Sequence, residues 1–129
     1  EERTDISRFT LRKNIFFLGP KSYADLPGLM SNFDVGILPT RKNDYTSSMF
    51  PMKFFEYLAS GIPVVAVEIP SLAKYASVAT LCKDAKGFSK GISEAIEIGF
   101  NSQAKAIRQT LASQNTYSKR TAQMLDLLD

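Results

Sequence analysis

The sequence contains no histidine and only one cysteine. Without histidine, the chain can supply neither a His-based catalytic triad, nor a His-ligated metal site, nor a histidine general base. Cys82 lies in a short apolar run, which is typical of a small buried side chain in a strand, and one cysteine cannot form an internal disulfide. Any chemistry must therefore come from carboxylates, Lys, Arg, hydroxyls or backbone amides, or from residues outside this chain.

Long apolar runs and clusters of charge are also missing. No apolar run approaches the about 20 residues that span a bilayer, and no charged start followed by an apolar stretch indicates a signal peptide. The net charge of +3 is spread along the chain without a basic run, so we predict no nucleic-acid partner. We expect a cytoplasmic protein, which in its intact form is either free or peripheral at the inner face of the membrane.

Alternating short apolar runs and helical patterns predict one α/β domain. The 129 residues, of which 44% are apolar, suit a single domain with its own core. We expect a partial Rossmann-like parallel sheet of about four strands, with flanking helices and a helical C-terminal tail. The expected strands are residues 15–18, 34–38, 62–67 and 78–82.

The helices are predicted from caps and apolar stripes. Ser22 and Asp25 form a capping-box pattern at the start of one helix, and a short helical stretch is expected at residues 71–75. Residues 40–50 show no period and are predicted as a loop. The tail is predicted to hold three helices, the last with Thr116 as its N-cap.

The helix predicted at residues 51–60 is the most informative element. Pro51 suits its first turn, and Gly61 suits the left-handed residue just past its end. Lys53 and Glu56 lie on one stripe of an otherwise apolar helix. One interpretation is an exposed ion pair on the only wet face. The other is a ligand-facing edge, where the helix N-terminus and Lys53 bind a phosphate and Glu56 accepts hydrogen bonds from sugar hydroxyls.

Three segments are expected to converge beyond the carboxyl ends of the strands, where parallel sheets bind their ligands. They are residues 19–22, 39–50 and 68–71. The sequence therefore predicts an anionic, nucleotide-like ligand held by backbone amides and Lys53.

Five sequence motifs follow one another along the chain. They are Asn14 to Gly19, Phe33 to Pro39, Pro51 to Gly61, Pro63 to Ala66, and Asn115 to Arg120. Together, in this order, they resemble the donor-nucleotide half of a two-domain, GT-B-fold glycosyltransferase of the family-4 type (glycosyl transferases group 1). The resemblance spans nearly the whole chain and is closest to bacterial members, several of which serve cell-surface polysaccharide synthesis.

The resemblance implies a donor-nucleotide site. Glu56 matches the glutamate that contacts the ribose, the amides of Met52 and Lys53 match the segment that faces the diphosphate, and Gly19 matches the turn near the base. The donor substrate is a nucleotide-diphosphate sugar, and no metal or further cofactor is expected. The implied donor-binding residues are Glu56, Lys53, Met52, Pro51, Gly19 and Pro20.

One family feature is absent from the sequence. The family typically carries a second glutamate eight positions before the ribose-binding one, near the transferred sugar, and Ser48 stands there instead. Ser48 and its neighbour Ser47 can hydrogen-bond a sugar, but a serine cannot hold a negative charge beside a developing oxocarbenium ion. The catalytic residues are left unassigned.

The family's donor domain normally begins with two further βα units, which residues 1–129 lack. We therefore expect a C-terminal part of that domain, a view that the start Glu1-Glu2-Arg3 without a Met also favours. The strand at residues 15–18 loses its usual neighbour, and an exposed parallel edge is unfavourable. This strand is expected to pair beside residues 34–38, or another chain, as in a homodimer, covers the edge.

The expected function is part of a retaining glycosyltransferase that transfers a sugar from a nucleotide-diphosphate sugar to a glycan or glycolipid acceptor. The fragment alone is expected to be inactive, because the acceptor site and the cations that neutralise the leaving group lie outside it. Two alternatives stay open. One is a nucleotide-sugar epimerase or phosphorylase of the same fold. The other is a non-catalytic α/β binding module, in which Lys53 and Glu56 are only a surface pair.

Overall fold

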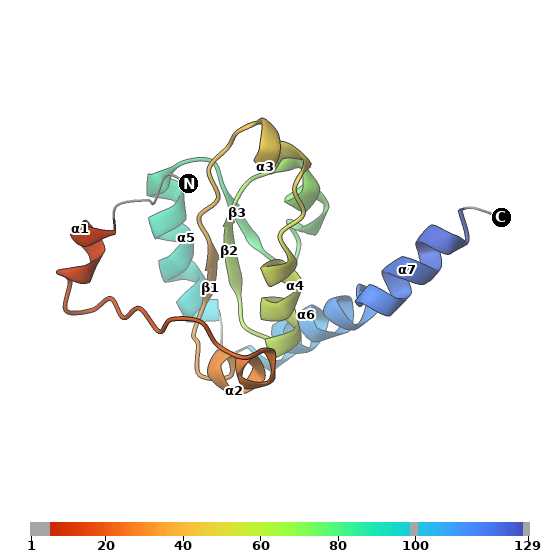
Figure 1. Cartoon of the computed structure of the whole chain (residues 1–129), viewed down its shortest axis with the longest axis horizontal. Helices are drawn as coiled ribbons and strands as arrows, with labels where there is room; N and C mark the ends of the chain where they lie inside the picture. Colours follow the sequence, from red (N-terminus) through yellow and green to blue (C-terminus); the bar gives the residue numbers. More distant parts are fainter. Residues whose placement is uncertain (1–5, 99–100, 128–129) are drawn as a thin grey trace.

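The computed structural model describes residues 6–98 and 101–127, and its centre is a three-stranded parallel sheet. The strands are β1 (Gly36–Leu38), β2 (Val64–Val67) and β3 (Thr80–Cys82), in the order β1-β2-β3. Ile37 pairs with Val65 across the first ladder, and Val65 pairs with Thr80 across the second. Because all three strands run the same way, their carboxyl ends meet at one edge, below α3 in Figure 1.

Helices cover both faces of this sheet (Figure 1). On one face, α4 packs with Val64 and Ala66 in a core that also holds Phe54 and Leu58. On the other face, α5 packs over Val65 of the same strand. The alternation along β2 follows from the period of two in a strand. The helical elements are α1 (Ser7–Thr10), η1 (Tyr23–Asp25), α2 (Leu26–Met30), α3 (Asp44–Ser48), α4 (Met52–Ser60), η2 (Pro70–Tyr75), α5 (Ala85–Ile98), α6 (Ser102–Gln114) and α7 (Tyr117–Leu125).

The α/β architecture and its helical tail confirm the predicted fold class. The strands expected at residues 34–38, 62–67 and 78–82 are present in shorter form, and the helical stretch expected near residues 71–75 is present as η2. Thr116 caps α7, since its hydroxyl oxygen accepts a hydrogen bond from the Lys119 amide at 3.4 Å.

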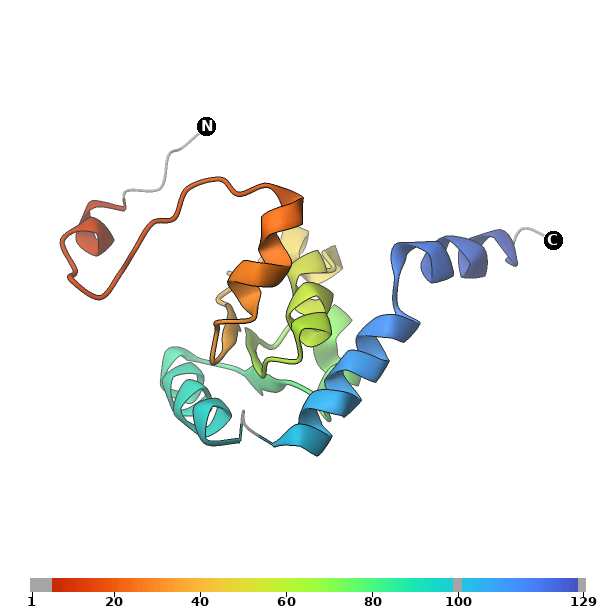
Figure 2. The ribbon, with the colours of Figure 1, turned by 90° about the horizontal axis from the view of Figure 1, so that it is seen from below.

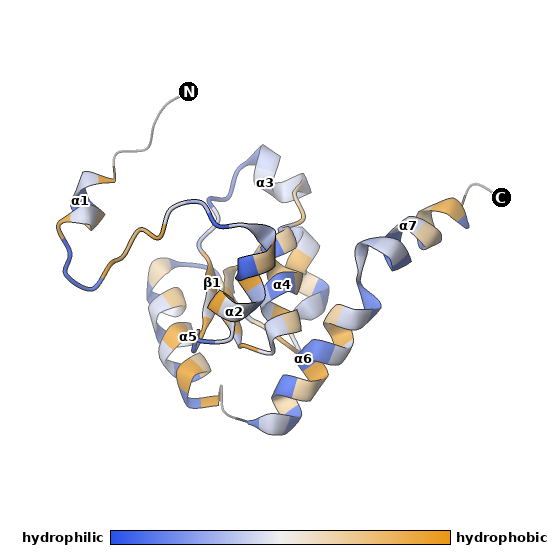
Figure 3. Ribbon diagram, turned by 60° about the horizontal axis from the view of Figure 1, so that its bottom comes forward, coloured by the Kyte–Doolittle hydropathy of each residue, from blue (hydrophilic) through white to orange (hydrophobic). Residues whose placement is uncertain are grey.

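The strand expected at residues 15–18 is absent, so the prediction that it pairs beside residues 34–38 is wrong for this chain. Residues 15–18 run without regular structure between α1 and α2, away from the sheet (Figures 1 and 2). Their side chains are exposed, Phe16 by 78%, and the apolar stretch is visible in Figure 3. A buried strand needs a hydrogen-bonded neighbour and cover on both faces. The described residues provide neither at this place, and β1 keeps one unpaired edge.

Two local predictions are also corrected. Residues 40–50 hold the short helix α3, because Asn43 and Thr46 form a capping box through bonds of 2.8 and 2.9 Å. The Ser22 hydroxyl donates to a carboxylate oxygen of Asp25 at 2.6 Å instead of capping the backbone. The helix that was predicted to start there begins with the 3-10 turn η1 and then continues as α2.

Helix α6 fixes the carboxyl end of α4. Gly61 ends α4 in the left-handed conformation, with a φ of 79°, as the sequence predicts. The Arg108 guanidinium, which is 5% exposed, donates from Nε to the Gly61 carbonyl at 2.9 Å. Its Nη2 has no hydrogen-bond partner, and burial lowers the pKa of this group. The cation thus lies at the negative end of the α4 dipole.

Candidate functional site

The amino end of α4 lies near the edge of the sheet where the strands end (Figure 1). Pro51 is the N-cap with extended backbone, so it precedes the first helical residue instead of occupying it as predicted. Its carbonyl accepts the Phe54 amide at 3.0 Å. The amides of Met52 and Lys53 belong to the first turn and have no acceptor within the helix. Two N–H groups at the positive end of the dipole are therefore available to an anion.

Lys53 and Glu56 form an ion pair on α4. Lys53 Nζ lies 2.5 Å from Glu56 Oε2, and the two side chains are 48% and 25% exposed. The pair confirms that these residues share one stripe of the helix. The Ser60 hydroxyl, one turn further along, donates to the Glu56 carbonyl at 3.1 Å and stays on the same stripe.

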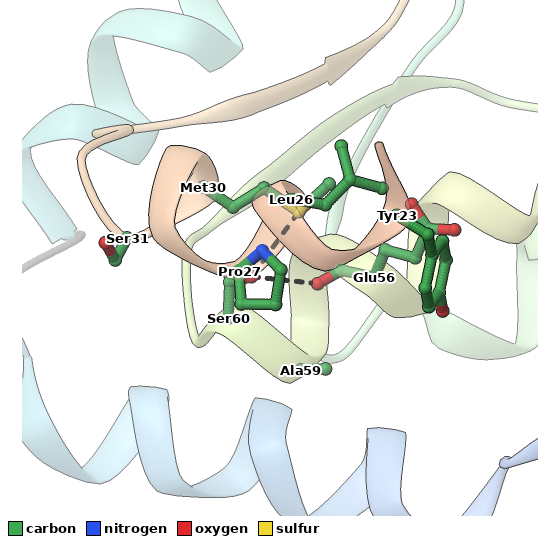
Figure 4. A pocket seen from close by; sticks show the side chains of 8 residues that line it. All are labelled: Tyr23, Leu26, Pro27, Met30, Ser31, Glu56, Ala59 and Ser60. Atoms are coloured by element: carbon green, nitrogen blue, oxygen red, sulfur yellow. Dashed lines mark hydrogen bonds between the residues drawn. The ribbon is translucent and has the colours of Figure 1, made fainter. Parts of the chain in front are cut away.

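A groove of about 260 Å³ lies between α2 and α4, and Glu56 is the charged residue on its wall (Figure 4). The Glu56 carboxylate and the Tyr23 ring lie at one end, and Met30 and Ser60 lie toward the other. Most of the exposed wall is apolar, and its polar groups lie at both ends. The lining residues are Tyr23, Leu26, Pro27, Met30, Ser31, Glu56, Ala59 and Ser60.

The predicted sugar-contact residues lie on α3, which precedes the amino end of α4. Ser47 and Ser48 are exposed. The Ser47 hydroxyl donates to the Asp44 carbonyl at 2.7 Å, which leaves its oxygen free to accept. The segment after α3 is fastened to η2, because the Ser71 hydroxyl donates to the Met49 carbonyl at 2.8 Å. This bond ties two of the three segments that were expected to converge at the site.

Gly19 and Pro20, the residues predicted near the base, are exposed in the segment before η1. Gly19 has a φ of 66°, and no atom lies within 4 Å of the position that a Cβ would take. The lining of the groove begins at Tyr23 instead. The sequence predicts a helix that starts near Ser22, but no pattern in it indicates that residues of this helix meet Glu56.

Helix α7 is anchored close to the same end of α4. The Arg120 guanidinium lies 4.5 Å from the ring centre of Phe50 and 4.7 Å from that of Phe55. These two rings are stacked 5.2 Å apart, and Phe50 directly precedes the N-cap. The cation therefore connects the tail to the segment that positions the amino end of α4.

The described residues contain neither a metal-ligand cluster nor a membrane-spanning helix. Among residues 6–98 and 101–127, no group of three or more His, Cys, Asp or Glu side chains is placed to hold a metal ion. Within the same ranges, no helix is long and apolar enough to cross a bilayer.

Comparison with known proteins agrees with the resemblance found in the sequence. Residues 1–97 match the family model described as "Glycosyl transferases group 1". A stretch of 61 residues is 39% identical to the "Putative teichuronic acid biosynthesis glycosyltransferase TuaH" of Bacillus subtilis (strain 168), and the match covers 47% of this chain and 15% of that protein. No solved structure matches the chain. The chain belongs to the glycosyl transferases group 1 family.

Proposed function

We propose that the chain is part of the donor-binding half of a glycosyltransferase that uses a nucleotide-diphosphate sugar. The observation that carries the proposal is the position of Glu56, which faces a groove and lies about one helical turn from the free amides of Met52 and Lys53. That separation suits a ligand with a hydroxylated ring next to a diphosphate. Family membership supports the same reading.

In the proposed reaction, the bond between the sugar's anomeric carbon and the diphosphate oxygen breaks, and the diphosphate leaves with the electron pair. The oxygen of an acceptor hydroxyl forms the new bond to the anomeric carbon, and the proton of that hydroxyl passes to the departing diphosphate. The amides at the amino end of α4 and the Lys53 ammonium stabilise the negative charge that develops on it. Lys53 turns from Glu56 toward the diphosphate, and the freed Glu56 carboxylate accepts hydrogen bonds from the ribose hydroxyls. Both side chains are exposed enough to move.

The remaining parts of the proposal rest on the family resemblance. Ser47 and Ser48 contact the transferred sugar, the anomeric configuration is retained, and no cofactor is needed besides the donor. The acceptor is a glycan or glycolipid of the bacterial cell surface, an inference supported by the name of the Bacillus relative. The intact enzyme is cytoplasmic or peripheral at the inner face of the membrane. The 129-residue chain alone is inactive, and a homodimer is one way to cover its sheet edge.

The test is calorimetric titration of the intact protein with UDP, ADP and GDP. We expect at least one of them to bind, and Glu56→Ala to weaken its binding about tenfold, because a hydrogen bond to a charged group is worth about 1.5 kcal/mol or more. Glu94→Ala is the matched control, since Glu94 pairs with Lys90 at 3.2 Å on α5. If Glu56→Ala and Glu94→Ala both bind like the wild type, Glu56 is not in the site.

A further inference from the structure

We propose that the groove between α2 and α4 takes the nucleoside end of the donor, and that Tyr23 is a binding residue that stacks on its base. The inference rests on the proposed function but names a residue that the sequence did not assign. It starts from the groove that Tyr23 and Glu56 share (Figure 4).

The size and lining of the groove favour a flat, mostly apolar ligand. Pockets that hold a whole drug-sized ligand measure about 300–1,000 Å³. At about 260 Å³, the groove accommodates a nucleoside-sized part of a nucleotide sugar and leaves the rest outside. Leu26, Pro27 and Met30 supply an apolar wall from α2, and Ala59 supplies a small one from α4. Such walls suit the faces of a base better than a hydrated sugar or phosphate.

The direction of the ligand follows from the order of residues along α4. The free amides lie at Met52 and Lys53, Glu56 lies in the middle, and Ala59 and Ser60 line the groove further along. Glu56 lies four positions after Met52, which corresponds to about 6 Å along the helix axis. Diphosphate, ribose and base therefore lie in that order from the amino end of α4 toward its carboxyl end.

Tyr23 is free to stack on a base at the mouth of the groove. It is 75% exposed and lies at the same end of the groove as the Glu56 carboxylate (Figure 4). Stacking of a base on an aromatic ring changes affinity about 5- to 150-fold on alanine substitution. An exposed tyrosine that contributes little to the core can be replaced without loss of the fold.

The test compares Tyr23→Ala with Tyr45→Ala in the intact protein. Tyr45, on α3, is also 75% exposed, which makes it a matched control. We expect Tyr23→Ala to weaken binding of the preferred nucleoside diphosphate at least fivefold, and to leave the affinity for inorganic pyrophosphate unchanged. Tyr23→Phe keeps the ring and binds like the wild type. Tyr45→Ala changes neither affinity.

A second variant tests the groove without removing Tyr23. Ala59→Phe fills the groove from α4, and it is expected to weaken nucleoside diphosphate binding by a similar factor while pyrophosphate binding persists. Wild-type affinity in both Tyr23→Ala and Ala59→Phe overturns the inference, and so does an equal loss for pyrophosphate and nucleotide. In either case the proposed function stands if Glu56→Ala still weakens binding. If the wild-type protein binds no nucleoside diphosphate, the proposed function itself fails.

Discussion

Lys53 Nζ contacts Glu56 Oε2 at 2.5 Å, three positions apart on the helix whose amino end is open to an anion. A partly exposed pair of this kind contributes at most about 1 kcal/mol to stability. The pair therefore matters little for folding. Its interest is that Lys53 lies in the first turn of α4, where the free amides are, and that Glu56 faces the groove.

Replacing Lys53 separates binding from stability. We expect Lys53→Ala to lower the free energy of unfolding by less than about 1 kcal/mol. It should weaken nucleoside diphosphate binding about tenfold, because it removes a charge-assisted contact worth about 1.5 kcal/mol. Calorimetry and urea unfolding measure the two effects. Lys90→Ala, which breaks the Lys90–Glu94 ion pair, should have a similarly small effect on stability and none on affinity. Equal affinities in the two variants would exclude Lys53 from the site.

The carboxyl end of α4 requires a glycine at position 61, because this residue adopts the left-handed conformation. Gly61→Ala places a Cβ at a φ of 79° and 2.6 Å from Cγ of Lys105, so the side chain of Lys105 must move as well. The left-handed conformation alone costs about 1–2 kcal/mol for a residue with a side chain. We expect urea unfolding to show at least that loss. Gly28→Ala, inside α2 with open space around it, should instead be neutral or stabilise by up to about 1 kcal/mol. The reverse order would contradict the α4 end described here.

Arg108 is expected to stabilise the joint between α4 and α6. Arg108→Ala leaves the Gly61 carbonyl without its donor and opens space in a buried position. A loss of roughly 2 kcal/mol in the free energy of unfolding follows from the charged hydrogen bond alone. Gln109→Ala removes an exposed contact of 3.3 Å to the Ala59 carbonyl and should cost less than about 0.5 kcal/mol. Similar small losses in both variants would mean that the Arg108 contact does not hold α4.

Stability should fall in alkaline solution. Burial, and then the nearby Asp84 and Glu94 carboxylates, raise the pKa of the Cys82 thiol above its usual value of 9.0. The unfolded chain loses this proton first, so the contribution is complete below about pH 9 and disappears as the pH rises through the raised pKa. Burial also raises the pKa of Tyr57 above 10.0, so the free energy of unfolding continues to fall at higher pH. Cys82→Ala should flatten the first part of a plot of unfolding free energy against pH. A wild-type plot that stays level from pH 8 to pH 11 would refute this.

Features specified by neighbouring residues could be predicted from the sequence. Helix α4 carries its own end signal in Gly61, and β2 is an apolar run of the right length. Residues 15–18 form an apolar run too, but a strand also needs a partner in space, and the described residues offer none. The helix α3 was overlooked because its cap pairs Asn43 with Thr46, without the Glu or Gln of the usual capping box.

The candidate site also has one part that local sequence patterns predict and one part that depends on packing. Lys53 and Glu56 lie on one helix, so their spacing alone places them on one stripe. The groove depends on how α2 packs against α4, which no local pattern determines. Tyr23 is therefore identified as a residue of the candidate site only by its position beside Glu56 in the structure.

Helix α4 is proposed to bind a nucleotide-diphosphate sugar along its length. The most direct measurement is a crystal structure of the intact protein with its preferred nucleoside diphosphate. We predict the diphosphate on the amides of Met52 and Lys53, the ribose hydroxyls on Glu56, and the base between Tyr23 and the α2 wall of the groove. A nucleotide bound elsewhere, with the Lys53–Glu56 pair intact and the groove unoccupied, would show that α4 is not the donor site.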